Sequence, residues 1–417
     1  MGRKLIGIVD PYSSGSLLAG DLKKRGCPCI MVQSTPEIPE LFRKSCHPED
    51  FCEIVQHRGS VEDTAAQLSA RGVSAVIAGC DLGVELADHL SENLGLPSNG
   101  TALSAERRNK FLMAQRVAAH GLRVPDQFCS RHLNELMDWT RQFNSWPVIV
   151  KPVGSCASDS VCRCASEAEV ETAYHGIMTH RNVLGKENSD VLVQEYLVGT
   201  EYVVDTVSCA GRHRAAGYWR YGKPADASFV CYDSMELLSY HGALQTRLFS
   251  FACAVLDALG VQYGPAHCEL MCHDNTITFI EMATRLTAGN NATLSRACGA
   301  TCQLDLTIDA YLHPVAFLDS MNKPQKLERW AANFFLMPRR KGRILAVPRM
   351  PEVQNLRSFY KGSVGATMGE PAPRVAGLVT LIHPDRKVIA EDILAIRNME
   401  DAGLYEIDES PSLQEQR

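Results

Sequence analysis

Short apolar runs alternate with amphipathic segments through the first hundred residues of the chain. The apolar runs have the length of buried strands, and the segments between them place apolar residues at helical spacing. The first amphipathic segment ends at a glycine, which is a common helix stop. This alternation predicts an α/β domain at the N-terminus. The expected strands lie at 4–10, 29–34 and 74–80, and the expected helices at 16–26, 61–72 and 83–97.

The rest of the chain mixes strands and helices. The strand at 146–151 ends in a lysine, and the two strands within 191–211 are joined by a short connection that contains glycine. A β-rich segment is predicted from about residue 320, and the polar tail after about residue 408 is expected to fray. The other expected elements are helices at 105–121, 244–260 and 293–312 and strands around Glu269 and Glu281.

Composition narrows the possible partners. The chain has 417 residues, 45% hydrophobic and 22% charged, with a formal net charge of −6. A chain of this length can bury several cores, so folding needs no disulfide or structural metal. The negative charge offers no basic surface for a phosphate backbone, so we expect no nucleic-acid partner. The first apolar run is too short for a signal peptide and no window approaches about 18 apolar residues, so we expect a cytoplasmic protein without a membrane span.

The sixteen cysteines are scattered through the chain, and none forms a CxxC pair. Zinc sites and redox motifs depend on such close, regular spacing. In a reducing compartment, isolated thiols usually act as small, mildly apolar core residues. We therefore expect core packing rather than metal binding from these residues.

The segment 263–291 carries the most specific pattern. Its sequence HDNT is a turn signal between two β-like runs, and Asn275 is a suitable left-handed residue. If the hairpin is centred on Asn275, Glu269 lies directly across from Glu281 on the same face of the sheet. The same register pairs His267 with Ala283, Met271 with Phe279, and Pro265 with Arg285.

Two carboxylates roughly 5 Å apart repel each other unless a positive charge lies between them. A divalent cation would supply this positive charge. Mg²⁺ prefers an octahedron of oxygen ligands, and two carboxylates would leave most of its coordination positions open for nucleotide phosphates. Arg285 on the same face adds a forked donor for a phosphoryl oxygen or a carboxylate. Two alternatives stay open: Glu269 and Glu281 can be exposed strand residues with Arg285 paired to one of them, or the register can slip by one.

Lys151 closes an apolar strand and is followed by the flexible sequence VGSCASDS. In this loop Gly154 lets the backbone approach a ligand, and the hydroxyls of Ser155, Ser158 and Ser160 can donate to phosphates. A lysine after a strand is also commonly a surface residue with its charge in water. Asp81, in GCDLG, follows a strand where ligand-contacting loops usually lie, although a helix-capping role fits it equally. The first turn, DPYSSGS, lacks the glycine spacing of a dinucleotide fingerprint.

In this order, NK at 109–110, VIVKP at 148–152, QEYLVGTEY at 194–202, AHCE at 266–269 and FIEMATR at 279–285 resemble the ATP-grasp superfamily. Within its biotin-carboxylase-like branch, the chain looks most similar to microbial L-amino-acid ligases of the bacilysin-type dipeptide synthetase group. The resemblance spans nearly the whole chain. It implies an α/β preface domain at 1–108, an ATP-grasp domain at 109–318 with a lid subdomain at about 125–198, and a β-rich subdomain at 319–417.

The resemblance also implies roles for individual residues. Lys110, Lys151 and Ser155 would contact ATP phosphates, and Glu269 and Glu281 would hold Mg²⁺, for which Mn²⁺ can substitute. Arg285 and Lys151 would be the catalytic residues, with Arg285 stabilising the acyl phosphate and the tetrahedral intermediate. Glu195, Tyr196 and Leu197 would form the hinge that binds the adenine, and Glu201 would accept hydrogen bonds from the ribose hydroxyls. The residues of the substrate pocket would be Asp81, His267, Arg285, Gly289 and Asn290.

One position departs from the superfamily pattern, because Ala283 stands where an asparagine commonly supplies a third oxygen ligand. Amino-acid ligases can share this change. The expected activity is therefore ATP-dependent joining of a carboxylate to an amine, with a dipeptide-forming L-amino-acid ligase as the leading version. The alternatives are a ligase for a non-proteinogenic acid, a biotin-carboxylase-like enzyme and a non-catalytic ATP-binding module. A homodimer is also expected by resemblance, and Gly289 is expected to leave room for a bulky second substrate.

Overall fold

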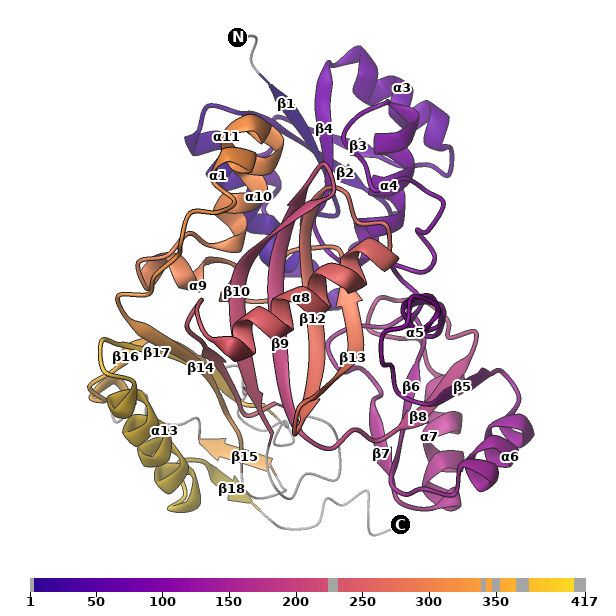
Figure 1. Ribbon diagram of the computed structural model, residues 1–417, viewed down its shortest axis with the longest axis vertical. Coiled ribbons are helices and arrows are strands. Elements are labelled where there is room, and N and C mark those ends of the chain that lie inside the picture. The colour runs from indigo at the N-terminus through magenta and orange to yellow at the C-terminus, as the bar shows by residue number, and fades with distance from the viewer. Residues whose placement is uncertain (1–3, 224–231, 339–342, 347–352, 365–374, 409–417) are drawn as a thin grey trace.

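The computed structural model describes residues 4–223, 232–338, 343–346, 353–364 and 375–408. It has the mixed α/β architecture that the sequence predicts, with three sheets of four or more strands and a two-stranded ribbon (Figure 1). The predicted polar tail lies outside the described residues. No helix among the described residues is both long and apolar enough to cross a membrane.

The N-terminal sheet is parallel, with strand order β3-β2-β1-β4. The chain moves outward from β1 through β2 to β3 and then crosses back to place β4 on the other side of β1. The sheet therefore has its topological switch point between β1 and β4, where ligands bind in open α/β sheets. The elements are β1 (Leu5–Val9), α1 (Ser16–Lys24), β2 (Cys29–Gln33), α2 (Glu40–Arg43), β3 (Glu53–Gln56), α3 (Val61–Ala70), β4 (Val73–Ala78) and α4 (Val84–Asn93).

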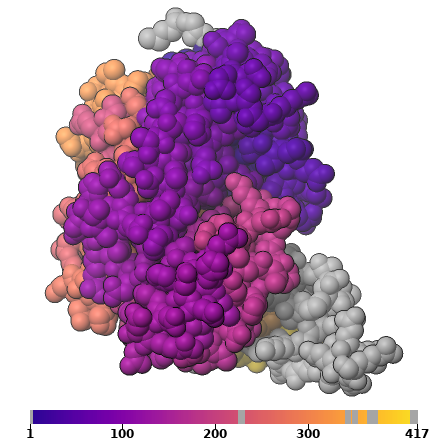
Figure 2. Space-filling model, turned by 90° about the vertical axis from the view of Figure 1, so that its right-hand side faces the viewer, coloured from indigo at the N-terminus to yellow at the C-terminus, as the bar shows by residue number. Residues whose placement is uncertain are grey.

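A second, four-stranded antiparallel sheet has the order β5-β8-β6-β7. It lies in the segment that the sequence predicts to be the lid, and we keep the name lid for this segment. Helices α6 and α7 cover one of its faces with apolar side chains. Figure 2 shows the lid, in purple and magenta, directly below the N-terminal domain. The two parts touch where Cys156 and Val183 pack against the N-terminal cluster of Tyr12 and Phe42. The elements are β5 (Gln127–Ser130), α6 (Leu133–Phe143), β6 (Val148–Pro152), β7 (Cys162–Cys164), α7 (Glu167–Thr179) and β8 (Val191–Glu195).

The largest sheet has eight strands in the order β13-β12-β9-β10-β11-β14-β17-β16. Figure 1 shows α8 crossing one face of it, and apolar residues of α8 bury the inner strands. The C-terminal strands β14, β17 and β16 extend this same sheet rather than forming a separate one. Its strands are β9 (Thr200–Cys209), β10 (Arg212–Gly222), β11 (Ser234–Leu237), β12 (Gly264–His273), β13 (Thr276–Ala283), β14 (Trp330–Leu336), β16 (Phe359–Val364) and β17 (Gly377–His383). The helices in this part of the chain are α8 (Ala243–Ala258), α9 (Asn291–Ala297), α10 (Gln303–Leu312) and α11 (Pro314–Asp319). The two-stranded ribbon pairs β15 (Arg343–Ala346) with β18 (Glu406–Asp408).

Three helices differ from their predicted form. Helix α5 (Lys110–Ala119) begins five residues later than expected, because the Asn109 side chain accepts from the backbone N–H groups of Phe111 and Leu112 and so caps it. The expected helix at 293–312 is divided into α9 and α10 around Gly299, whose φ of 90° breaks helical geometry. Helix α13 (Arg386–Asp401) packs on β14 and β17 and was not anticipated within the β-rich segment.

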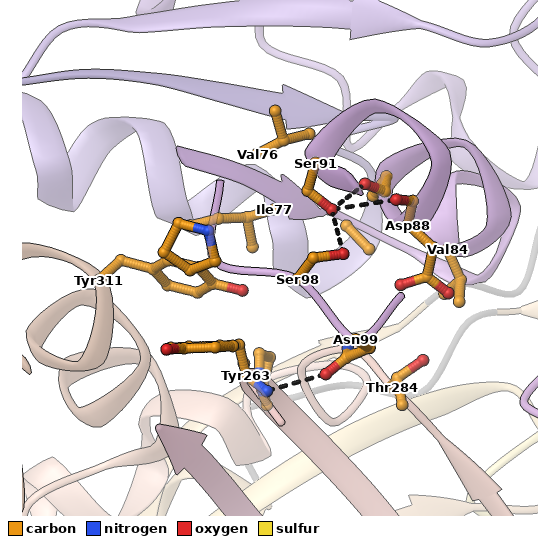
Figure 3. Close-up of a pocket in the computed structure, with 15 residues that line it drawn as sticks. Val76, Ile77, Val84, Asp88, Ser91, Ser98, Asn99, Tyr263, Thr284 and Tyr311 are labelled. Carbon is orange, nitrogen blue, oxygen red and sulfur yellow. Dashed lines mark hydrogen bonds between the residues drawn. The ribbon is translucent and has the colours of Figure 1, made fainter. Parts of the chain in front are cut away.

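The junction between the N-terminal domain and the large sheet is held by a buried ion pair. The Arg107 side chain is fully buried and donates to Asp88 and to the backbone carbonyl of Leu259. A polar cavity of about 20 Å³ lies beside Asp88, a volume suited to about one water molecule. Figure 3 shows Tyr263 and Tyr311 facing each other across this cavity. The junction is thus closed by polar contacts and leaves no room for a substrate.

The cysteines stay separate in the structure. Of the fifteen that it describes, eight are buried. No group of three or more His, Cys, Asp or Glu side chains among the described residues is arranged to hold a metal ion. The cysteines therefore act in this fold mainly through packing.

Candidate active site

The β12–β13 hairpin pairs Glu269 with Glu281 and His267 with Ala283, as the sequence predicts. Closer to the turn the predicted register is wrong, because Leu270 pairs with Phe279 and Met271 with Thr278. Ile280 is therefore an extra residue in a β-bulge between the two pairings.

The turn explains this shift. It consists of the two residues Asp274 and Asn275, and Asp274 rather than Asn275 adopts the left-handed conformation, with a φ of 50°. A turn of two residues puts the centre of the hairpin between Asp274 and Asn275, half a position before the predicted centre at Asn275. The bulge adds one residue to β13, so the predicted register returns at Glu269 and Glu281. The predicted pair of Pro265 with Arg285 does not form, since β13 ends at Ala283.

Both glutamates line a cavity of about 650 Å³ that lies between the three sheets. Their side chains are 14% and 28% exposed, for Glu269 and Glu281 respectively. Neither is a freely solvated strand residue, which rules out the first alternative. The register has not slipped at this position, which rules out the second.

Two lysines stand beside the glutamates. Lys110 Nζ lies 3.4 Å from Glu281 Oε2 and donates to the backbone carbonyl of Ser155 at 2.6 Å. Lys151 is only 4% exposed, so it is no surface residue. Burial lowers the pKa of Lys151, and the negative charge of Glu281 opposes that shift. Although burial favours the neutral acid, Lys110 and Lys151 hold the pKa of Glu281 below its usual value.

Asp81 joins two arginines at the edge of the same cavity. Its carboxylate accepts from Arg285 Nε at 2.8 Å and from Arg108 Nη1 at 3.0 Å. Burial acts against this charge, but Arg285 and Arg108 keep the pKa of Asp81 well below its usual value. Cys80, and not Asp81, is the N-cap of the turn that begins at Asp81, and the Asp81 carboxylate pairs with the two arginines, so the structure does not support the capping alternative. Arg285 is paired with Asp81 and not with either glutamate.

His267 lies between two carboxylates. It donates from Nδ1 to Asp205 Oδ1 at 2.8 Å and from Nε2 to Glu269 Oε1 at 3.2 Å, while Trp219 donates to the other oxygen of Asp205 at 2.7 Å. Burial disfavours the imidazolium, yet the hydrogen bonds to Asp205 and Glu269 raise the pKa of His267 to about 9. Both ring nitrogens are thus committed, and the ring orients Glu269.

The other end of the cavity lies at the hinge between β8 and β9. Tyr196 and Leu197 line it, together with the buried side chain of Gln194. Glu195 does not line the cavity; its carboxylate accepts from the Asp126 backbone N–H at 3.2 Å. Strand alternation accounts for this difference, because neighbouring side chains on β8 point to opposite faces.

Glu201 is buried in the cavity wall, and both of its carboxylate oxygens have protein partners. Tyr232 donates to Oε1 at 2.8 Å, and Lys223 Nζ lies 2.6 Å from Oε2. Burial raises the pKa of Glu201, and Lys223 opposes the shift. A ribose hydroxyl at this position would therefore share Glu201 with Lys223 and Tyr232.

The loop after Lys151 folds back on itself. The Ser155 hydroxyl donates to Asp159 at 2.6 Å, while Ser158 and Ser160 are exposed. Ala157, Ser158 and Ser160 all have positive φ values, between 54° and 56°. Such strained backbone is common in ligand-binding loops. In this arrangement the Ser155 backbone carbonyl, held by Lys110, ties the loop to the start of α5.

Two predicted pocket residues, Gly289 and Asn290, do not line the cavity. Gly289 has a φ of 66°, and a Cβ added there would meet no atom within 4 Å. Asn290 donates to the Thr380 hydroxyl at 2.9 Å and accepts from Asn333 at 2.6 Å, so it fixes this loop to the C-terminal strands. Ala288, between Arg285 and these residues, lines the cavity instead.

Among the residues of the site that the sequence analysis missed are Arg108, Gln194 and Asp205. Arg108 stood two residues before the recognised Lys110, inside a stretch assigned to a helix. Asp205 is on β9 and meets His267 because β9 pairs with β12. Strand alternation from Tyr196 could have identified Gln194, but no local signal pointed to Asp205 or Arg108.

Residues 144–294 match the family model described as an ATP-grasp domain. The chain therefore contains a segment that matches an ATP-grasp domain, and it has the ATP-grasp fold.

Individual relatives extend the comparison over the whole chain. The chain is 28% identical over 415 residues to dapdiamide A synthase of Enterobacter agglomerans, covering 95% of this chain and 96% of that protein. The L-amino acid ligase of Bacillus licheniformis has a similar fold, with a TM-score of 0.74, 16% identity and coverage of 95% and 98%. The ADP complex of N5-carboxyaminoimidazole synthetase from Staphylococcus aureus gives a TM-score of 0.69 at 14% identity, covering 94% and 96%.

Proposed function

We propose that the protein is an ATP-dependent carboxylate–amine ligase that works through an acyl phosphate and releases ADP and phosphate. The observation that carries this proposal is the pairing of Glu269 with Glu281 on one cavity wall, beside Lys110, Lys151 and Arg285. The two carboxylates form a hard oxygen donor set, which fits Mg²⁺. The metal would bind Glu269 and Glu281 and neutralise phosphate charge.

The first half-reaction is phosphoryl transfer from ATP to a carboxylate. This chemistry depends mainly on positioning and charge neutralisation. Lys110 and Lys151 would contact the phosphates, and the backbone of the loop at Ser155 would close over them. Tyr196 and Leu197 would contact the adenine. The attacking carboxylate then forms a bond to the γ-phosphorus as the bond to ADP breaks.

The second half-reaction is attack by an amine on the acyl carbon. Arg285 would stabilise the negative charge that develops on the carbonyl oxygen, and Asp81 holds the guanidinium for this role. The C–N bond forms, phosphate leaves, and the amine loses a proton. His267 is a poor candidate for the base, because both of its nitrogens already donate to carboxylates.

Two versions of this activity are supported. The L-amino-acid ligase version joins two amino acids, and the fold shared with the Bacillus licheniformis enzyme supports it. The second version joins a non-proteinogenic acid to an amino acid, and the similarity to dapdiamide A synthase over nearly the full chain supports it. The domain boundaries and the homodimer stay proposals. Size-exclusion chromatography tests whether the protein forms a homodimer.

The test uses two reaction mixtures that contain the protein and Mg-ATP. The first adds the twenty L-amino acids, and the second adds the same amino acids together with a panel of keto, hydroxy and dicarboxylic acids. ADP and product masses are followed together. Dipeptides identify the first version, and products that contain a panel acid identify the second. Formation of AMP, ADP release that requires only bicarbonate, or ATP binding without turnover would each overturn the proposal.

Paired variants connect the result to the site. Glu281→Ala is expected to abolish turnover, because it removes one of the two proposed metal ligands. Glu236→Gln is the matched control: this strand carboxylate pairs with Arg220 and Arg386 and does not line the cavity. Wild-type turnover in Glu281→Ala would remove the metal from the proposed mechanism.

A further inference from the structure

Arg108 is a strongly positioned cation at the cavity, and the proposed reaction gives it no role. Its side chain is 14% exposed and lines the cavity. The backbone around it is fixed, because Arg107 is buried in the ion pair with Asp88 and Asn109 caps α5. Lys110 N donates to the Val153 carbonyl at 3.0 Å, which fixes the next turn as well. The guanidinium is therefore held in place before any ligand binds.

The charges around Asp81 do not balance. One carboxylate accepts from two guanidinium groups, those of Arg285 and Arg108, so the trio carries one net positive charge. Asp81 accepts from a single Arg108 nitrogen, Nη1, and the structure gives the Arg108 guanidinium no other acceptor among the described residues. A guanidinium has five N–H donors in a planar fork that matches a carboxylate. The arrangement thus suits a second anion beside the one that Arg285 stabilises.

The position of Asp81 in the N-terminal sheet supports a ligand at this end. Asp81 follows β4, next to the loop that follows β1, and this is the switch point of the sheet. Ser13, Ser14 and Ser45 line the cavity here. The loops approach so closely that a Cβ on Gly79 would lie 2.5 Å from the Asp10 carbonyl oxygen. Polar groups from two loops therefore converge on the space beside Arg108.

We propose that Arg108 binds a substrate carboxylate that does not react, namely the free α-carboxylate of an amino-acid acceptor. The inference rests on the proposed ligase activity and adds the acceptor's class: an α-amino acid in its free acid form, rather than a simple amine, an ester or an amide. In this role Arg108 determines specificity, while Arg285 serves the reacting acyl group. Asp81 positions both guanidinium groups.

An internal competition tests the assignment. The enzyme receives Mg-ATP, the donor acid that supports ADP release, and an equimolar mixture of the twenty L-amino acids and their carboxamides. Mass spectrometry then gives the ratio of products that end in a free carboxylate to products that end in an amide. Because both acceptors compete in one reaction, this ratio does not depend on how much of a variant is folded.

The wild-type ratio is expected to favour the free acid at least about tenfold, and Arg108→Gln should reduce it about 10- to 100-fold, the range for losing a hydrogen-bonded charge. Arg108→Lys should retain part of the preference. Arg116→Gln on α5 is the matched control, because Arg116 donates to the Ala258 carbonyl and does not line the cavity. Its ratio should equal that of the wild type.

Three outcomes would overturn the assignment: a wild-type ratio near one, an unchanged ratio in Arg108→Gln, or a ratio that changes equally in Arg116→Gln. An unchanged ratio with a raised KM for ATP would assign Arg108 to phosphate binding instead. If the wild type releases no ADP with any acid, the proposed function itself fails. That result is distinct, since it appears before any acceptor is compared.

Discussion

Replacing Asp81 with asparagine tests whether this carboxylate holds the arginines of the site. The variant keeps the shape of the side chain and removes its charge from two ion pairs, at 2.8 and 3.0 Å. The three side chains are 10% to 14% exposed, so solvent screens these contacts only weakly. Breaking such a buried pair usually costs about 3–5 kcal/mol. We expect the free energy of unfolding to fall by about that amount.

The effect on catalysis should be separate and measurable. Loss of one charge-assisted hydrogen bond to Arg285 is worth about 1.5–3 kcal/mol, so kcat should fall about 10- to 100-fold if all of it is felt in the transition state. The KM for ATP should change little. Asp88→Asn is the matched control: it weakens the buried pair with Arg107, and Asp88 itself does not line the candidate active-site cavity. It should lower stability while leaving kcat per folded molecule unchanged.

The pH dependence of the stability difference has a defined sign. The pKa of Asp81 lies below its unfolded value of about 3.9, so its stabilisation is complete above that pH and is lost as pH falls through the folded pKa. Denaturant titrations of wild type and Asp81→Asn should therefore differ by a constant amount from pH 8 to pH 5 and converge in stronger acid. A difference under about 1 kcal/mol at pH 7, or equal kcat values, would refute the reasoning.

Three further variants probe the remaining groups. Lys151→Met should leave the melting temperature unchanged or raise it, because the substitution removes a buried charge. It should also raise the KM for ATP at least about tenfold, and a KM equal to that of the wild type would contradict the role of Lys151 in phosphate binding. His267→Gln should raise the Mg²⁺ concentration for half-maximal rate about 10- to 100-fold, because Glu269 loses its orienting partner; Mg²⁺ titration of the rate measures this, and an unchanged requirement speaks against it. Glu269→Gln should abolish Mg²⁺-dependent ADP release while circular dichroism stays that of the wild type; appreciable turnover would exclude Glu269 as a metal ligand.

The sequence predicted those parts of the site that lie on one hairpin. Strand periodicity and the turn signal were enough to place Glu269 opposite Glu281, although the left-handed conformation of Asp274 and the bulge at Ile280 could not be anticipated. A bulge depends on how the hairpin packs against the neighbouring sheet, and that information is not local. The same limit applies to α13, where short apolar runs fit a strand and a helix equally well.

Contacts between distant segments account for most of what was missed. Arg285 and Asp81 are 204 positions apart in the chain, and Arg108 reaches Asp81 across 27 positions. No periodicity relates such residues. Asp205 and His267 are 62 positions apart and meet only because β9 lies beside β12. Sequence patterns identify which residues one strand or helix presents, whereas the order of the sheets decides which of those residues meet.

The site is shared by three parts of the chain, and this division follows from the chemistry proposed for it. Asp81 comes from the N-terminal sheet, Lys151 from the lid, and the two glutamates from the large sheet. An acyl phosphate must be protected from water, so its binding groups need to surround it on several sides. The contact of Lys110 with both Glu281 and the Ser155 carbonyl links the metal position to the lid loop. A change that loosens this link is therefore expected to increase hydrolysis of the intermediate, seen as ADP release without product, before it abolishes ATP binding.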